Sequence, residues 1–278
     1  MRKTFISSVL IVLGFTTLAS AQQRPLVTED PETVGEHVVL IEGGMDYQHS
    51  IEYPVSGLEG NLLRLPTLGV SFGLGASAEF QIDGGLFDHL SVTSRRRAPL
   101  SGALKFTGDS TSDFEDITVA TKIRLVSEAP GRPAFGIRFA TKLPTASNES
   151  GLGLDTTDFL ISTLLGKTVQ SVRLVGNVGV AILGEPLQAT SQNESLTYGF
   201  SFARAVKQGV EIVGEINGRH EFRNGEPPPG TEDRSAMRFG VRATTGAIRF
   251  DGGLIIGLAS RDPNYGFTGG LTWVFRTQ

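Results

Sequence analysis

The sequence has 278 residues and no cysteine. An exported chain without cysteine has no disulfide framework, and it also lacks the lipid-bearing cysteine that a lipoprotein needs directly after its leader. Beyond the N-terminal leader, no segment comes near the roughly 18 to 20 consecutive apolar residues that a membrane helix requires. The sequence therefore excludes a disulfide scaffold, a lipid anchor and a second membrane helix.

The chain also has no surplus of basic residues. Its formal net charge is −4, or about −6 without Arg2 and Lys3, which disfavours a nucleic-acid partner. No Pro/Ser linker, charge block or low-complexity tract divides the chain, so we expect one domain. The 35 glycines and 13 prolines accompany plentiful apolar residues, which fits neither collagen nor disorder. We find no metal or cofactor motif and expect neither group.

The first residues have the pattern of a secretory signal peptide. Arg2 and Lys3 precede an apolar stretch, and a run of small residues follows that ends at Ala21. We expect residues 1–21 to be the signal peptide, cleaved after Ala21.

From residue 36 onward, apolar and polar residues alternate. In AIRFDGGLIIGLA, Ile248 and Phe250 alternate with Arg249 and Asp251. A period of two over about ten residues predicts a strand with one apolar face. About twelve such segments follow one another, each of the length that crosses a bilayer when tilted. The pattern predicts an all-β fold: a single transmembrane antiparallel β-barrel over residues 36–278.

The connections between these segments alternate in length. Residues 48–61, 91–114 and 145–157 form long connections, whereas Gly75-Ala76 and Lys207-Gln208 form short ones. Transmembrane barrels have this pattern, with short periplasmic turns and longer extracellular loops.

Alternation alone does not say which face points inward. A soluble barrel of the lipocalin kind points apolar residues toward a ligand and charges toward water. Two features favour the inverted arrangement of a membrane barrel. The non-apolar face carries Gly, Ser, Thr and Ala between its charges, as a packed lumen requires, and aromatic residues lie near the predicted strand ends. These aromatic residues are Tyr47, Phe72, Phe135, Phe159, Tyr198, Phe222, Tyr265, Trp273 and Phe275.

In the inverted arrangement, the charged residues of the strands face the lumen. Acids dominate the early strands, bases the middle ones, and the later strands mix both. Such arcs either pair and fill the lumen or leave a polarised pore that selects solutes, and the sequence leaves both interpretations open. The lumen-facing residues are Glu42, Asp46, Glu79, Asp83, Lys122, Arg124, Arg138, Lys142, Arg173, Glu211, Glu215, Arg219, Arg238, Arg242, Arg249 and Asp251.

Residues 22–35 form an acidic segment before the first predicted strand. Pro25 and Pro31 keep this segment out of regular ladders. Its acids lack the spacing and central glycine of a calcium loop, so we interpret the segment as a solvated periplasmic arm rather than a cation site. As a hypothesis, the arm folds into the lower lumen, where Glu29 and Asp30 face Arg124 or Arg138. The side chains of this segment that could bind a cation are those of Glu29, Asp30, Glu32, Glu36 and His37.

Two further motifs bear on function. His89 and Ser91 are two residues apart, as in outer-membrane phospholipases, but no Asn follows to orient the histidine. We therefore predict no catalytic residue and no enzymatic activity. The run 95–97 of three arginines fits either an ordinary solvated loop or contact with anionic lipid head groups.

Two stretches resemble the outer-membrane family named for the meta-pathway of phenol degradation. They are RPLVTEDPETVGEHVVLIEGG at the start of the mature chain and KLPTASNESGLGLDTTDF in its middle. The resemblance implies an outer-membrane barrel that passes or binds hydrophobic or aromatic compounds. Such barrels commonly end on an aromatic residue, whereas here Phe275 is followed by three more residues. The residues that match the family block are Lys142, Leu143, Pro144, Thr145, Gly151, Gly153, Asp155 and Asp158.

These observations predict an outer-membrane barrel that acts as a passive channel or uptake protein for small solutes, aromatic or hydrophobic ones among them. The alternative is a structural or surface-interaction barrel with a closed lumen. A lipid hydrolase is a remote third. The expected partners are outer-membrane lipid and a small-molecule solute, and the number of subunits stays open.

Overall fold

The computed structural model describes residues 24–188, 190–222 and 227–277. The expected signal peptide lies outside these residues. Within them, the structure holds no helix long and apolar enough to cross a membrane. In chain order the strands are β1 (Val38–Tyr53), β2 (Leu58–Gly73), β3 (Ala78–Gly85), β4 (Asp88–Arg95), β5 (Ser110–Asp113), β6 (Ile117–Val126), β7 (Ala134–Leu143), β8 (Asp158–Val169), β9 (Val172–Gly184), β10 (Gln192–Lys207), β11 (Val210–Glu221), β12 (Arg234–Thr245), β13 (Ile248–Gly257) and β14 (Tyr265–Arg276).

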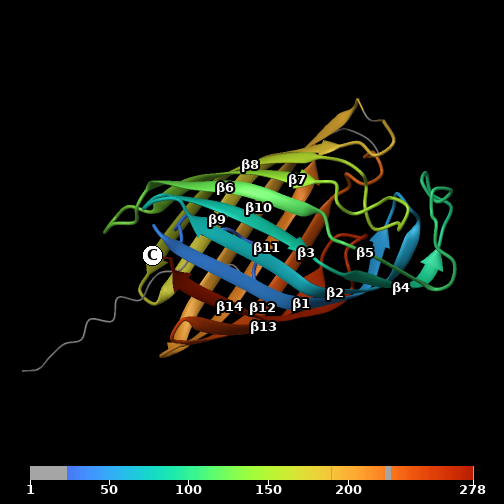
Figure 1. The fold of residues 1–278 in the computed structure, drawn as a ribbon. Helices are drawn as coiled ribbons and strands as arrows, with labels where there is room; N and C mark the ends of the chain where they lie inside the picture. The colour runs from blue at the N-terminus through green and yellow to red at the C-terminus, as the bar shows by residue number, and fades with distance from the viewer. Residues whose placement is uncertain (1–23, 189, 223–226, 278) are drawn as a thin grey trace, which may run out of the picture.

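Twelve of these strands form a closed antiparallel barrel (Figure 1). Hydrogen-bonded neighbours run from β14 down to β6, then to β3 and β2, and β1 closes the ring by pairing with both β2 and β14. The first and last strands pair from Val38 opposite Arg276 to His49 opposite Tyr265. The closed ring leaves no strand edge unpaired. This confirms the predicted fold class.

An extension continues the sheet beyond one end of the barrel, where β4 and β5 lie in Figure 1. One half of β2 pairs with β3 and the other half with β4, and β4 pairs in turn with β5. Leu58, Leu62 and Leu90 form a buried apolar core there. Long side chains from the neighbouring loops pack against that core, among them Leu104 and Phe106.

The extension corrects two predicted connections. Residues 48–61 are mostly strand, because β1 continues to Tyr53 and β2 begins at Leu58. Residues 91–114 contain the end of β4 and all of β5. The predicted lengths were too long because the strands leave the barrel here and cover an apolar core of their own. The end of the barrel with the short connections at 75–76 and 207–208 is the short-turn end. The opposite end, which carries the extension, is the long-loop end.

The structure also decides the direction of the two faces. On β13, Phe250 is 53% exposed on the outside whereas its neighbour Arg249 is 4% exposed. Lys122 and Glu79 are fully buried inside the barrel. Apolar side chains therefore cover the outside and charged side chains fill the inside, which is the reverse of a soluble barrel.

Only some of the aromatic residues predicted at strand ends lie there among the described residues. Tyr265 opens β14, and Trp273 and Phe275 lie near its other end, where their rings are 4.5 Å apart. Tyr47 and Tyr198, however, lie in the interior of β1 and β10. The prediction was wrong for these two because both strands extend farther than their alternation indicated.

Candidate functional site

The described part of the N-terminal arm lies inside the barrel at the short-turn half. Because β1 begins at Val38, the name arm is used from here for residues 24–37. The backbone N–H groups of Val27 and Thr28 donate to the carboxylate of Glu215, at 2.8–3.0 Å. The N–H of Val34 donates to the carboxylate of Glu79 at 2.6 Å. The arm is thus held by carboxylates from opposite sides of the wall.

The acids of the arm pair with bases of the wall. Glu29 lies 3.2 Å from Lys122 and 2.9 Å from Arg138. Asp30 pairs with Arg173 at 2.6 Å, and Glu32 pairs with Arg124. These contacts place Glu29 opposite Arg138, as the hypothesis had it, but give Asp30 a partner other than the two expected.

Glu29 is buried rather than solvated, with 6% of its surface exposed. Burial raises the pKa of this carboxyl, but the attraction of Lys122 and Arg138 outweighs burial and lowers the pKa below its ordinary value. The interpretation of a solvated arm is therefore wrong for Glu29, because its charge is matched by wall cations that the sequence pattern could not assign to it. Among the described residues, no cluster of acids and histidines has the arrangement of a metal site.

Arg24 anchors the other end of the arm. Its guanidinium lies 3.7 Å from Asp46 and 3.5 Å from Asp251, and it donates to the Thr268 hydroxyl at 2.9 Å. Its own carbonyl accepts from Nε of Arg242 at 2.8 Å. The sequence analysis did not include Arg24 among the lumen residues, because Arg24 precedes the alternating segments. The one signal for its position was that the early strands, which follow it in the chain, are acidic.

Inward glycines make room for the arm. A Cβ added at Gly73 would lie 1.6 Å from the backbone oxygen of Gly35, and one at Gly240 would lie 2.8 Å from the Pro25 ring. Both distances are shorter than a van der Waals contact. Gly73 and Gly240 are therefore positions where the arm approaches the wall too closely for a larger side chain.

The other lumen residues named from the sequence pair mostly within the wall. Glu79 lies 3.0 Å from Lys122, and Glu215 lies 3.0 Å from Arg238. Asp83 lies 3.6 Å from Arg138. The remaining placements are Glu42 at 3.6 Å from Arg249, Lys142 at 2.8 Å from Asp158, and Glu211 opposite Arg242 in the β11–β12 register.

Two cavities lie in the lumen beside the arm. One of about 590 Å³ has Val27, Glu29 and Arg238 in its lining, and one of about 480 Å³ has Arg24, Val27 and Asp83. Pockets for small molecules have volumes of about 300–1,000 Å³. The arm therefore forms one boundary of a space that fits a small molecule.

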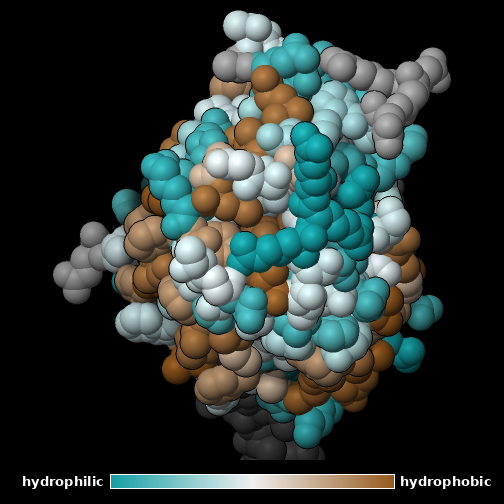
Figure 2. All heavy atoms as spheres, turned by 90° about the vertical axis from the view of Figure 1, so that its right-hand side faces the viewer, coloured by the Kyte–Doolittle hydropathy of each residue, from teal (hydrophilic) through white to brown (hydrophobic). Residues whose placement is uncertain are grey.

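Loops cover the barrel at the long-loop end. Residue Gly230 lies against Val55, Leu154 and Pro186, each within 3.0–3.3 Å of the position that a Cβ would take. Figure 2 looks onto this end and shows side chains over the middle of the face, with hydrophilic residues prominent there and hydrophobic residues both among them and toward the lower edge. A cavity of about 200 Å³, lined in part by Tyr53 and Leu154, lies beneath them.

The loop that resembles the family block is folded against the extension. Gly151 has a φ of 80°, and a Cβ there would lie 2.6 Å from Leu58. Asp155 accepts from the Asn148 N–H at 3.1 Å, and Thr145 accepts from the Ile117 N–H at 2.9 Å. At the same end of the barrel, Asn193 is fully buried in β10 and donates to Thr231 at 2.9 Å.

His89 is hydrogen-bonded to Ser112 rather than to Ser91. Its Nδ1 lies 2.8 Å from the hydroxyl of Ser112, which stands opposite it across β4 and β5. In the described chain no acid contacts the ring of His89, so the third group of a hydrolase site is missing. Of the three arginines, Arg96 pairs with Glu59 at 2.9 Å and Arg95 lies over the Phe106 ring, so two of them stabilise the extension.

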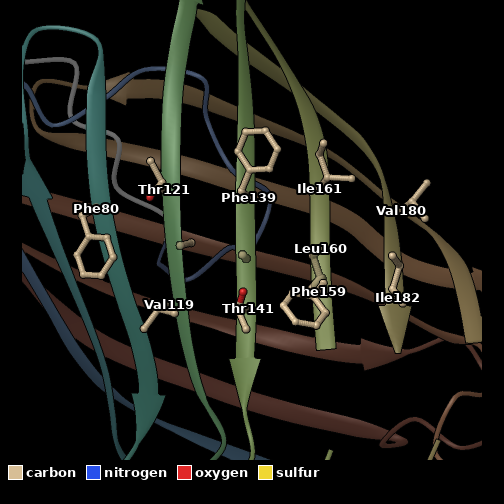
Figure 3. A pocket seen from close by; sticks show the side chains of 12 residues that line it. Phe80, Val119, Thr121, Phe139, Thr141, Phe159, Leu160, Ile161, Val180 and Ile182 are labelled. Carbon is tan, nitrogen blue, oxygen red and sulfur yellow. The ribbon is translucent and has the colours of Figure 1, made fainter. Parts of the chain in front are cut away.

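A shallow groove of about 380 Å³ lies on the outer face of β6 to β9. The small side chains of Thr121 and Thr141 stand between Phe80, Phe139 and Phe159, which spread over the wall in Figure 3. Its lining is predominantly apolar, and the ladder behind it is continuous from β6 to β9. The groove belongs to the apolar outer surface and gives no passage into the lumen.

Comparison with known proteins supports the fold. Neither a family model nor a curated protein matches the sequence. The COG4313 outer membrane channel from Pseudomonas putida F1 is similar in structure, with a TM-score of 0.65 at 12% identity over 88% of this chain and 98% of that one. The NanC porin has a TM-score of 0.51 at 9% identity, over 84% of this chain and 98% of that one. LpxR from Salmonella typhimurium has a TM-score of 0.50 at 10% identity, over 86% of this chain and 100% of that one. The resemblance to the phenol meta-pathway family stays a prediction.

Proposed function

We propose that the protein is an outer-membrane barrel that takes up small solutes through its lumen. The apolar outer face and the charged inner face suit a wall in contact with lipid, and the N-terminal leader suits export. The short-turn end then faces the periplasm and the long-loop end faces outward. The similar channel and porin structures agree with this assignment at the level of the fold.

The observation that carries the proposal is the pair of lumen cavities between the arm and the outer loops. A purely structural barrel has no need of an internal space of small-molecule size with both charged and apolar walls. The solute enters from the long-loop end, occupies this space and leaves past the arm. The arm would then act as a partial barrier at the periplasmic end.

The contacts of the arm also favour the alternative, a barrel with a closed lumen. Glu29, Asp30 and Glu32 are all paired with wall cations, so the arm is firmly attached. In that case the arm is a permanent filler, and the cavities hold only water.

Conductance in a planar bilayer separates the two functions. The refolded mature protein is compared with a variant that lacks residues 24–35, with correct insertion shown by the shift in gel mobility on heating. We expect small current steps for the full protein and larger steps for the deletion. Two silent bilayers would overturn solute uptake through the lumen and favour the structural barrel.

A further inference from the structure

Arg219, on β11, lies where the three internal cavities meet. It contributes to the lining of the cavities of about 590, 480 and 200 Å³. A solute that moves from the outer loops toward the arm therefore passes this side chain. Few positions in the described lumen share this property.

The guanidinium of Arg219 differs from its neighbours in its partners. Its Nε donates to the Glu232 carbonyl and its Nη2 to the Gly230 carbonyl, both at 2.9 Å. No carboxylate of the described residues lies within 4.0 Å of it, whereas Arg138 and Arg238 each have one at 2.9–3.0 Å. Among the described groups, no acceptor binds its Nη1. The guanidinium of Arg219 is thus oriented by loop carbonyls and has no carboxylate in ion-pair contact among the described residues.

Three acids lie near Arg219, and two of them are paired with other cations. Asp158 lies 2.8 Å from Lys142, and Asp262 lies 3.4 Å from Arg234. The third, Glu232, accepts from the Gly230 N–H at 2.9 Å and lies beyond ion-pair distance of Arg219. Arg234 also stands directly opposite Arg219 in the β11–β12 register. Like charges directly opposite in a sheet repel each other, so an anion at this place would relieve the repulsion as well as pair with Arg219.

One part of the cavity of about 590 Å³ is suited to an apolar body. Leu164 is fully buried and Ile255 is 2% exposed, and both line it together with Leu160 and Tyr53. A guanidinium binds a carboxylate through two parallel hydrogen bonds in the ideal case and through one when its other nitrogens are engaged. The lining therefore combines a cation that has no ion pair with a patch of aliphatic and aromatic carbon among polar side chains.

We propose that Arg219 binds the carboxylate of a small organic anion with an apolar or aromatic body. The inference deepens the proposed function, because it names the class of solute that would occupy the lumen. The anionic group lies at Arg219, below the outer loops, and the apolar body lies against Leu160 and its neighbours. When the anion moves toward the arm, its carboxylate leaves Arg219 and meets the charged side chains of the wall beyond it.

Calorimetric titration of the refolded mature protein in detergent tests the site without requiring conductance. The ligands are benzoate, its uncharged analogue benzamide, and benzylammonium. The variants are Arg219→Gln, Arg219→Lys and Arg204→Gln. Arg204 is an exposed residue near the end of β10 that has no ion pair in the described chain, so its variant removes the same charge outside the lumen.

We expect benzoate to bind the wild type and the Arg204→Gln variant alike, and the other two ligands to bind at least about tenfold more weakly. Arg219→Gln should lower benzoate affinity by about tenfold or more, and Arg219→Lys by less. Equal affinity for benzoate and benzamide in the wild type would overturn the proposal even if Arg219→Gln failed to fold. So would undiminished benzoate binding by folded Arg219→Gln.

Conductance measurements on the same proteins in a planar bilayer distinguish this proposal from the proposed function. Arg219-dependent binding with a silent bilayer would support the anion site and overturn uptake through the lumen. Current steps that benzoate leaves unchanged, together with no benzoate binding, would support the channel and overturn the anion site.

Discussion

The carboxylate of Glu29 lies 3.2 Å from the ammonium group of Lys122, and both side chains are buried. Lys122 stands on β6 with a second carboxylate, that of Glu79, at 3.0 Å. One wall cation is therefore shared by an acid of the arm and an acid of the wall. Removing either acid would leave part of a buried charge unmatched, which makes this contact the strongest candidate for holding the arm in place.

Replacing Glu29 by Gln should loosen the arm. The amide keeps a hydrogen-bonding group but loses the attraction to Lys122 and Arg138, at a cost of roughly 1–3 kcal/mol. The chain has no cysteine, so a single cysteine at Thr33, a buried arm position, reports arm opening by its rate of reaction with a maleimide. We expect that rate to rise about tenfold or more, because opening of the arm becomes easier. Glu36→Gln is the control, since Glu36 is exposed and its ion pair among the described residues is with the exposed His37. An equal effect of both substitutions would contradict the role of Glu29.

Acidification should weaken the arm through the same residue. Because the pKa of Glu29 is lowered below its ordinary value of 4.5, the group stabilises the fold fully above that value and loses its contribution as pH falls through the lowered pKa. The difference in urea unfolding midpoint between the wild type and Glu29→Gln should be constant near neutral pH and shrink below pH 4.5. A difference that stays constant down to pH 3 would show that Glu29 does not carry this pH dependence.

A methyl group at Gly73 should displace the arm. The added Cβ would meet the Gly35 oxygen at 1.6 Å, and backbone cannot yield as a flexible side chain does. Gly73→Ala should therefore increase maleimide labelling at position 33 and increase the conductance step. Gly75→Ala is a matched control two residues away, where an added Cβ meets nothing within 4 Å. The close-approach argument fails if the two variants behave alike.

Truncating Leu62 should unfold the extension and spare the barrel. Leu62 is fully buried in the small apolar core, and shortening a buried leucine to alanine costs roughly 2–5 kcal/mol. Limited proteolysis should then cut residues 96–109 faster, while heating is still needed to unfold the barrel on a gel. Leu74→Ala, at a leucine that is 65% exposed, should leave the cleavage rate unchanged. Slow cleavage in both variants would mean that other contacts hold the extension.

The sequence was most informative about the positions of the strands and least informative about which charged side chains contact each other. Alternation in segments such as 247–259 reports that one face is apolar, and the number and length of such segments indicate a large barrel. The long connections were overestimated at 48–61 because alternation weakens where a strand leaves the barrel for a separate core. Glu29 was expected to face a basic residue, and it does contact Arg138, but the buried Lys122 beside it was not foreseen.

By itself, the sequence determined the fold class, the alternating faces and the acidic character of the arm, because these properties depend on residues close together in the chain. Only the tertiary structure decided that the charged face points inward and that Arg24 and Glu29 of the arm contact charged residues of the wall. It also decided that Arg219 lines three cavities without a carboxylate partner among the described residues. These relations join residues from strands far apart in sequence. Barrel closure brings them together, and local periodicity contains no information about which residues then meet.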